Sequence, residues 1–306
     1  MGPTASGKTD LAVRLTENFP MDIVSVDSAM VYRTLDIGTA KPDPSTLAKA
    51  PHRLIDIRDP KDAYSAAQFR DDALFHIRAI FSQKRIPLLV GGTMLYFRAL
   101  QKGLSDLPSA DSAIRKKITE EAIQSGWDNL HADLLKVDPV AAARIHPHDT
   151  QRIQRALEVY RLTGKTLTSF QAASDPTVSQ YTFYNLAIAP QDRRILHARI
   201  AIRFRHMLEN GLVDEVRKLQ ARGDLTLDMP AIRSVGYRQV WEYLSGQCTF
   251  HEMETRGIIA TRQLAKRQLT WLRSWPDVVW FDSEAADLYP RVADFILKHC
   301  QPYGIK

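Results

Sequence analysis

The residues whose types and spacing point most clearly to chemistry lie at the start of the chain, in the segment 2–9, which reads GPTASGKT. It satisfies the pattern G-x-x-x-x-G-K-[ST], in which glycines let backbone N–H groups turn toward phosphate oxygens. Lys8 would supply a positive charge to the terminal phosphate, and the hydroxyl of Thr9 would ligate Mg²⁺. We therefore predict a phosphate or diphosphate site made of Gly2, Pro3, Thr4, Ala5, Ser6, Gly7, Lys8 and Thr9.

The sequence context supports this loop on one side only. After the loop, Leu11, Leu15 and Phe19 recur at four-residue spacing, which is typical of an amphipathic helix. Such a loop ordinarily follows a buried strand, and only Met1 precedes it here. We expect that strand to lie before residue 1.

Asp27 is the acidic residue best placed to act with this loop. It follows an apolar segment, 22–26, that reads as a short buried strand, and sites in parallel sheets form beyond the carboxyl ends of strands. The alternative is that Asp27 only caps a turn, as Asp before Ser often does. The apolar strand expected at 87–90 ends in Gly91-Gly92 rather than in a magnesium-binding Asp, and no Asn-Lys-x-Asp guanine motif occurs, which argues against a GTPase.

The composition is that of a globular protein with a basic bias. Of 306 residues, 44% are apolar and 25% charged, no apolar run approaches the length of a membrane span, and no signal peptide opens the chain. Only Cys248 and Cys300 are present, so we expect a cytoplasmic protein without disulfides. The net charge is +6, and the segments 193–205 and 256–273 carry arginines and lysines without an acid. Each is either a solvated helix face or a surface for a polyanion.

The order of the expected elements indicates an α/β fold. Strands are expected at 22–26, 52–57 and 87–90, and a helix that Ser65 and Gln68 open as a capping box carries apolar residues inward to about residue 81. Alternation of strand and helix at this spacing favours a parallel sheet. Further strands are expected at 184–188 and 278–281, and a long basic helix at 257–275.

The middle of the chain has a different character. From 111 to about 171 the pattern is mostly helical, with a helix that Asp149 would cap and Gly164 would end. We therefore predict a parallel-sheet core flanked by helices, like that of the P-loop NTPases, over residues 1–109 and 186–306. An all-helical domain, 110–185, would be inserted into it.

Several segments, taken together, resemble one family, the tRNA dimethylallyltransferases. The match runs in order from Met1 to about Trp275. The chain lacks the zinc-finger extension of eukaryotic members, so it resembles the bacterial type. The segments are 2–9, 25–32 (SVDSAMVY), 36–42 (DIGTAKP), 51–56 (PHRLID), 64–66 (YSA), 90–96 (VGGTMLY), 151–158 (QRIQRALE), 232–239 (IRSVGYRQ) and 261–268 (TRQLAKRQ).

The resemblance implies transfer of a dimethylallyl group from dimethylallyl diphosphate to N6 of the adenosine on the 3′ side of the tRNA anticodon. The phosphate loop would hold the leaving diphosphate, with Lys8, Mg²⁺ at Thr9, and Arg203 stabilising its charge. Asp27 would act as the general base toward the exocyclic amine, and the adenine would leave its stack to reach it.

By the same resemblance, a larger set of residues would face tRNA, and the helical insertion would grip the anticodon stem-loop. Nothing in the sequence requires a dimer, so a monomer is expected. The tRNA-facing set is Asp27, Ser28, Ala29, Met30, Thr93, Arg115, Gln151, Arg152, Ile153, Gln154, Arg155, Arg233, Ser234, Val235, Gly236, Tyr237, Arg238, Lys266, Arg267 and Arg273.

Two other function classes remain open from the residues alone. A phosphate loop also suits a small-molecule kinase, which would need ATP and would have no use for the basic segments after residue 193. A non-catalytic RNA-binding module would explain the basic segments but would leave the loop and Asp27 without a role.

Overall fold

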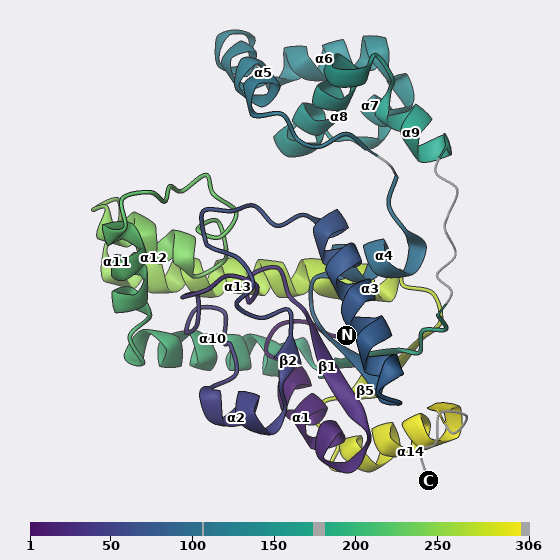
Figure 1. Ribbon diagram of the computed structural model, residues 1–306. Coiled ribbons are helices and arrows are strands. Elements are labelled where there is room, and N and C mark those ends of the chain that lie inside the picture. Colours follow the sequence, from purple (N-terminus) through teal and green to yellow (C-terminus); the bar gives the residue numbers. More distant parts are fainter. Residues whose placement is uncertain (106, 174–180, 301–306) are drawn as a thin grey trace. The chain divides into compact units, whose positions relative to one another are not determined.

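The computed structural model describes residues 1–105, 107–173 and 181–300 (Figure 1). The chain divides into two compact units. The first joins Met1–Leu100 with Tyr181–Lys306, and the second is Gln101–Gln180.

The first unit contains two small parallel sheets. Strands β1 (Met21–Val26), β2 (His52–Arg53) and β3 (Ile86–Gly91) form one sheet in the order β2-β1-β3, with Val26 of β1 opposite Gly91 of β3. Strands β4 (Asn185–Ala189) and β5 (Val278–Asp282) form the other. All pairings are parallel, so the carboxyl ends of β1 and β3 lie at the same edge.

Helices cover both faces of the first sheet. Alternate side chains of a strand point to opposite faces, and in β1 Ile23 packs with Ala12, whereas Val24 and Val26 belong to the cluster that contains Phe69. Ala12 is in α1 and Phe69 is in α3, so these two helices cover opposite faces. The helices of this unit are α1 (Lys8–Asn18), α2 (Pro44–Lys49), α3 (Ala66–Ser82), α4 (Met94–Lys102), α10 (Arg193–Glu209), α11 (Leu212–Ala221), α12 (Tyr237–Leu244), α13 (Phe250–Arg273) and α14 (Leu288–Cys300).

The second unit is built from helices around a core of its own. Ile118, Leu130, Leu134, Ile153 and Leu157 are buried together in it. Its helices are α5 (Ser112–Ser125), α6 (Trp127–Val137), α7 (Pro139–Arg144), α8 (Thr150–Thr163) and α9 (Leu167–Ala173).

Local sequence signals located several helix ends correctly. Ser65 and Gln68 form the predicted capping box of α3. The side chain of Asp149 caps α8, which ends at Gly164 in the left-handed region, φ 69°. These ends could be predicted because each depends on a few neighbouring residues.

Other expectations need correction. The predicted strand 52–57 ends at Arg53, because Leu54 (φ 65°) and Asp56 (φ 57°) adopt left-handed backbone conformations that leave the sheet. The long basic helix begins at Phe250, where Thr249 and Glu252 form a capping box, rather than at 257. The limits of the helical unit also differ from the predicted 110–185, since Tyr184 packs against Phe295 in the first unit.

Among the described residues, no helix combines the length and the apolar character that spanning a bilayer requires.

Candidate active site

The segment 2–9 forms a tight loop that ends in α1. Ala5 (φ 62°) and Gly7 (φ 78°) both adopt left-handed conformations, and at Gly7 this geometry favours glycine over any other residue. Successive N–H groups in such a turn face one concave side, which suits an anion. The loop leaves the second sheet, because Met1 donates to the carbonyl of Leu186 (2.7 Å) and accepts from the N–H of Ile188 (3.0 Å).

Lys8 lies in the interior of this loop. Its ammonium group donates a hydrogen bond to the carbonyl of Pro3 at 2.6 Å. The pKa of Lys8 is lowered to about 7, mainly by burial and in addition by the positive charge of Arg203, while the charge of Asp27 opposes the shift. Two cations thus sit close together in a half-buried position, an arrangement that a bound anion would stabilise.

Arg203 of α10 reaches the loop from the other half of the first unit. Its guanidinium donates to the hydroxyl of Thr4, and burial lowers its pKa, against the effect of Asp27. The structure distinguishes this arginine from three of the other arginines in the basic segment 193–205. Carboxylates pair with Arg194 (Asp192), Arg199 (Glu284) and Arg205 (Glu254).

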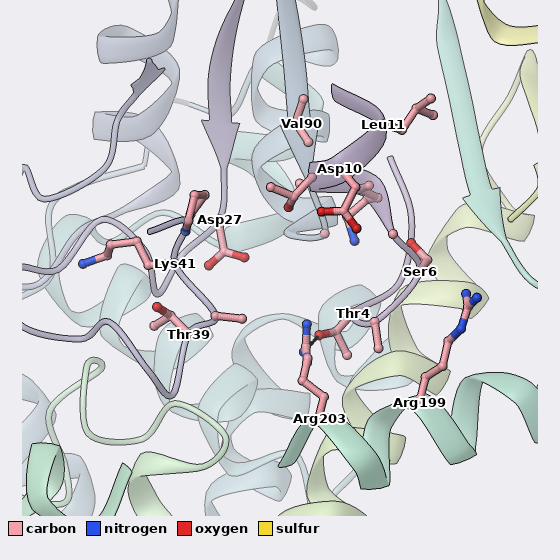
Figure 2. A pocket seen from close by; sticks show the side chains of 18 of the residues that line it. Thr4, Ser6, Asp10, Leu11, Asp27, Thr39, Lys41, Val90, Arg199 and Arg203 are labelled. Atoms are coloured by element: carbon pink, nitrogen blue, oxygen red, sulfur yellow. Dashed lines mark hydrogen bonds between the residues drawn. The ribbon is translucent and has the colours of Figure 1, made fainter. Parts of the chain in front are cut away.

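Asp27 lies where β1 ends, as predicted. One carboxylate oxygen, Oδ1, accepts hydrogen bonds from the N–H groups of Ala29 (2.8 Å) and Met30 (3.2 Å). The other, Oδ2, accepts none from the described residues. Figure 2 shows the carboxylate of Asp27 across the cavity from Thr4. Asp27 therefore caps its turn and still presents one oxygen to the cavity.

Gln268 ties three parts of the site together, and the sequence analysis did not select it. Its amide oxygen accepts from the N–H of Thr4 (2.9 Å), and its amide nitrogen donates to the carbonyl of Gly92 (2.9 Å). A Cβ at Gly92 would lie 2.4 Å from that nitrogen, so this close contact requires glycine. Gln268 lies in the motif 261–268, but its residue type alone carries no signal of this role.

Thr93 holds the turn after Asp27. Its hydroxyl accepts from the N–H of Ser28 at 3.0 Å, and its own N–H donates to the carbonyl of Val26 at 3.2 Å. The ends of β1 and β3 are thereby fixed to one another next to Asp27.

Two cavities meet at these residues. The first, of about 1400 Å³, is bordered by the loop in the segment 2–9, the segment 36–43 and α10 (Figure 2). The second, of about 500 Å³, is bordered by Ser28, Thr93, the segment 233–235 and α13, with apolar walls from Phe204 and Leu264. Both are lined by Thr4, Asp27, Thr39, Gly92, Arg203, Met207 and Gln268.

The predicted tRNA-facing residues of the first unit divide into groups. Met30 lines the first cavity, while Arg238, Lys266 and Arg273 are exposed outside the second, Arg238 in an ion pair with Glu242. Gly236 is buried at the N-terminal end of α12. The second cavity is lined by Asp27, Ser28, Ala29, Thr93, Arg233, Ser234, Val235 and Arg267, and also by Tyr237.

In the second unit, two of the predicted arginines have structural partners. The buried carboxylate of Glu158 accepts from Arg115 (2.9 Å) and Arg155 (2.6 Å). Gln154 is also engaged, since its amide donates to the carbonyl of Arg115. Gln151 is exposed, and Arg152 is 68% exposed with a 3.5 Å pairing to Asp149, so Arg152 is the most accessible of the three predicted arginines in this unit.

Two residues of the predicted tRNA-facing set have side chains that are buried in the free protein. Ile153 and Tyr237 have no exposed surface. Ile153 lies on the inward face of α8, and the hydroxyl of Tyr237 donates to Glu215. Membership in a motif does not reveal which side chains of a helix point inward.

Trp271, on the last turn of α13, is partly buried and lines the second cavity, whereas Trp275, just beyond the end of this helix, is buried and packs edge-on against Phe97.

Comparison with known proteins was made on the whole chain. The IPP transferase family model matches residues 30–275. Curated tRNA dimethylallyltransferases of Coxiella burnetii, from strains CbuG_Q212 and RSA 493 / Nine Mile phase I, are 58% identical over 296 residues, covering 97% of this chain and 98% and 95% of those proteins. The chain belongs to the tRNA dimethylallyltransferase family.

Solved structures of this family have the same fold. The full-length tRNA isopentenylpyrophosphate transferase of Bacillus halodurans superimposes with a TM-score of 0.72 at 36% identity, covering 99% of this chain and 95% of that one. The Staphylococcus epidermidis enzyme gives 0.70 at 30% identity, covering 97% of each chain. A eukaryotic dimethylallyltransferase acting on tRNA gives a TM-score of 0.81 at 24% identity, covering 100% of this chain and 79% of that one. This match shows a similar fold.

Proposed function

We propose that this chain transfers the dimethylallyl group of dimethylallyl diphosphate to N6 of the adenosine on the 3′ side of a tRNA anticodon and releases diphosphate. The observation that carries the proposal is the junction of two cavities at Asp27, Thr4 and Arg203. An anion-binding loop lies on one side of the junction. A partly apolar cavity bordered by Arg233 and Arg267 lies on the other.

The first cavity suits the diphosphate donor. Backbone N–H groups of the loop, Lys8 and Arg203 would bind the diphosphate and stabilise the charge that builds as the allylic C–O bond breaks. The guanidinium of Arg203 and the N–H groups of the loop are in place before the substrate arrives, and bound diphosphate would favour the charged form of Lys8. We also propose that this loop and α1 make the core P-loop NTPase-like, since the backbone of Met1 pairs with β4 as a strand would.

Magnesium fits this site as a partner of the substrate. The described residues contain no group of three His, Cys, Asp or Glu side chains that could hold a metal ion. Mg²⁺ is commonly bound by one or two protein oxygens together with substrate phosphates and water, and Thr9 lines the first cavity. Thr9 would hold the ion, which when bound would neutralise charge on the diphosphate.

The second cavity suits the adenosine of tRNA. An adenine taken out of its stack would enter between the segment 233–235 and α13, with Phe204 and Trp271 as apolar walls. Oδ2 of Asp27 would accept a proton of the exocyclic amine as N6 forms its bond to the allylic carbon. Diphosphate leaves with the electrons of the broken C–O bond, so charge and atoms balance.

The helical unit is proposed to bind the anticodon stem-loop through exposed polar side chains, with Arg152 as the main cation. The affinity for tRNA would then fall as the salt concentration rises, with a slope set by the number of phosphates contacted.

The test uses tRNA, dimethylallyl diphosphate and Mg²⁺ without ATP. A mass gain of one dimethylallyl group on the anticodon-adjacent adenosine is expected. If no gain occurs, and phosphate appears on a small acceptor once ATP is added, the protein is a kinase instead. Binding of tRNA without either reaction would favour the RNA-binding module.

A further inference from the structure

Both carboxylate oxygens of Glu215, on α11, accept hydrogen bonds from residues that border the two cavities. Oε2 accepts from the N–H groups of Asp36 (3.1 Å) and Ile37 (2.8 Å). Oε1 accepts from the N–H of Gly38 (3.2 Å) and from the hydroxyl of Tyr237 (2.5 Å). One side chain thus joins a turn early in the chain to a helix two hundred residues later in sequence.

The turn that Glu215 holds forms a wall of both cavities. Ile37 and Lys41 line the first cavity, Gly38 lines the second, and Thr39 lines both. Figure 2 shows Thr39 and Lys41 on the same side of the first cavity as Asp27. The ammonium group of Lys41 forms an ion pair with the carboxylate of Asp36 (2.5 Å), which links the residues that follow the turn to its first residue.

Tyr237 connects the same carboxylate to the opposite wall. It begins α12, directly after the segment 233–235 that lines the second cavity. Its ring lies under Gly38, where a Cβ would come within 2.5 Å of it, so the turn and the ring are in close contact. Burial, followed by the charge of Glu215, raises the pKa of Tyr237 far above its ordinary range, so the phenol remains a donor.

We propose that Glu215 is a positioning residue that sets the distance between the donor and acceptor cavities, acting through the turn 36–38 on one side and Tyr237 on the other. The proposal rests on the proposed function. Neither Glu215 nor Asp36 touches the reacting atoms in this scheme. They act by fixing the positions of the residues that line the two cavities. Since the nucleophile and the allylic carbon must approach to about 3–3.5 Å, a shift of one wall by 1 Å can cost about a hundredfold in rate.

The conservative variants separate the two connections. In Glu215→Gln, one oxygen becomes an NH₂ group that faces N–H or O–H donors, so at least one bond is lost. Tyr237→Phe keeps the buried ring against Gly38 and removes only the hydroxyl that reaches Glu215. Asp214→Asn is the matched control, because Asp214 is the neighbouring residue on α11, is exposed, and forms an ion pair with Arg217 on the surface.

The experiment measures kcat, the KM for dimethylallyl diphosphate and for tRNA, and the melting temperature of the full chain. Glu215→Gln is expected to lower kcat by tenfold or more, and Tyr237→Phe by less, with each KM within about threefold of wild type. Because Tyr237 acts through Glu215, the double variant should be little worse than Glu215→Gln alone. Asp214→Asn should retain the wild-type kcat.

Three results would overturn the proposal. One is a lower melting temperature with an unchanged kcat in the folded variants, which assigns a purely structural role. Another is a rise in KM at constant kcat, which assigns a binding role. The third, if Glu215→Gln does not fold, is a wild-type kcat for Tyr237→Phe. Failure of wild type to transfer the group would contradict the proposed function instead, before any variant is compared.

Discussion

At the scale of single residues, Asp27 has two roles that the structure allows to be separated. Oδ1 caps the turn through Ala29 and Met30, while Oδ2 faces the cavity. Asparagine retains an oxygen for the turn but cannot take a proton from the amine. Alanine removes both functions.

We therefore expect Asp27→Asn to lower kcat for transfer by about 10²-fold or more, with the Kd for tRNA within twofold of wild type. Steady-state transfer assays and filter binding give the two quantities. Asp27→Ala should be at least as impaired. If Asp27→Asn transfers normally and only Asp27→Ala fails, Asp27 is a turn cap and not the base.

Lys8 gives a prediction about pH. Its pKa is about 7 in the free site, lowered by burial first and by Arg203 second. A bound diphosphate favours the ammonium form, so above pH 7 binding must take up a proton. The affinity for dimethylallyl diphosphate should then fall as pH rises from 7 to 9, by up to about tenfold per unit.

Titration calorimetry in two buffers of different protonation enthalpy measures this uptake directly. Lys8→Arg is the control, since arginine stays charged throughout and should take up no proton at this position. Equal uptake by wild type and Lys8→Arg would show that another group, including the substrate itself, causes the pH dependence.

At the scale of elements, the carboxylate of Glu158 links α8 to α5. This carboxylate is fully buried and accepts from Arg115, Arg155 and the N–H of Asp111. Burial acts to raise the pKa of Glu158, but the hydrogen bonds from the two arginines outweigh it, so the pKa is lowered. Its stabilisation is therefore present above the ordinary pKa of 4.5 and is lost as pH falls below it.

Glu158→Gln should destabilise the helical unit by about 3 kcal/mol, because it leaves two arginines without their anion. Hydrogen exchange followed by mass spectrometry should show faster exchange in α5 and α8, with no change in α1 or α13. Glu121→Gln, which removes a surface partner of Arg161 between the same two helices, should cost no more than about 1 kcal/mol. Similar effects of both variants would contradict a special role for the buried carboxylate.

At the scale of the whole molecule, the question is how tRNA affinity is distributed over the basic residues. Arg155 is a poor test of this, because its guanidinium also donates to Glu158 and to the carbonyl of Pro108. Arg152 is exposed, and its ion pair with Asp149 is long, at 3.5 Å.

Arg152→Gln should weaken the binding of tRNAs whatever their sequence. It should also lower the slope of log Kd against the logarithm of the salt concentration by about one. The same titration on Lys136→Gln, an exposed lysine of α6 that pairs with Asp133, should leave the slope unchanged. A wild-type slope for Arg152→Gln would remove Arg152 from the RNA contacts.

What the sequence by itself determined is local. The turn in the segment 2–9 with α1, the strand that ends just before Asp27, the capping box at Ser65 and the helix between Asp149 and Gly164 each depend on residues within a few positions of one another. Spacing and residue type carry that information, because the backbone geometry of a turn or a helix end is decided by its neighbours. The ordered set of motifs also identified the family correctly.

What only the tertiary structure decided is which distant side chains meet. Nothing in the sequence singles out Gln268 as the clamp of Thr4 and Gly92, or Glu215 as the acceptor of the turn 36–38. Their polar side chains resemble many surface residues until packing brings α11 and α13 to those positions. The inward position of Ile153 was missed for the same reason: burial belongs to the packed helices, and the motif alone does not contain it.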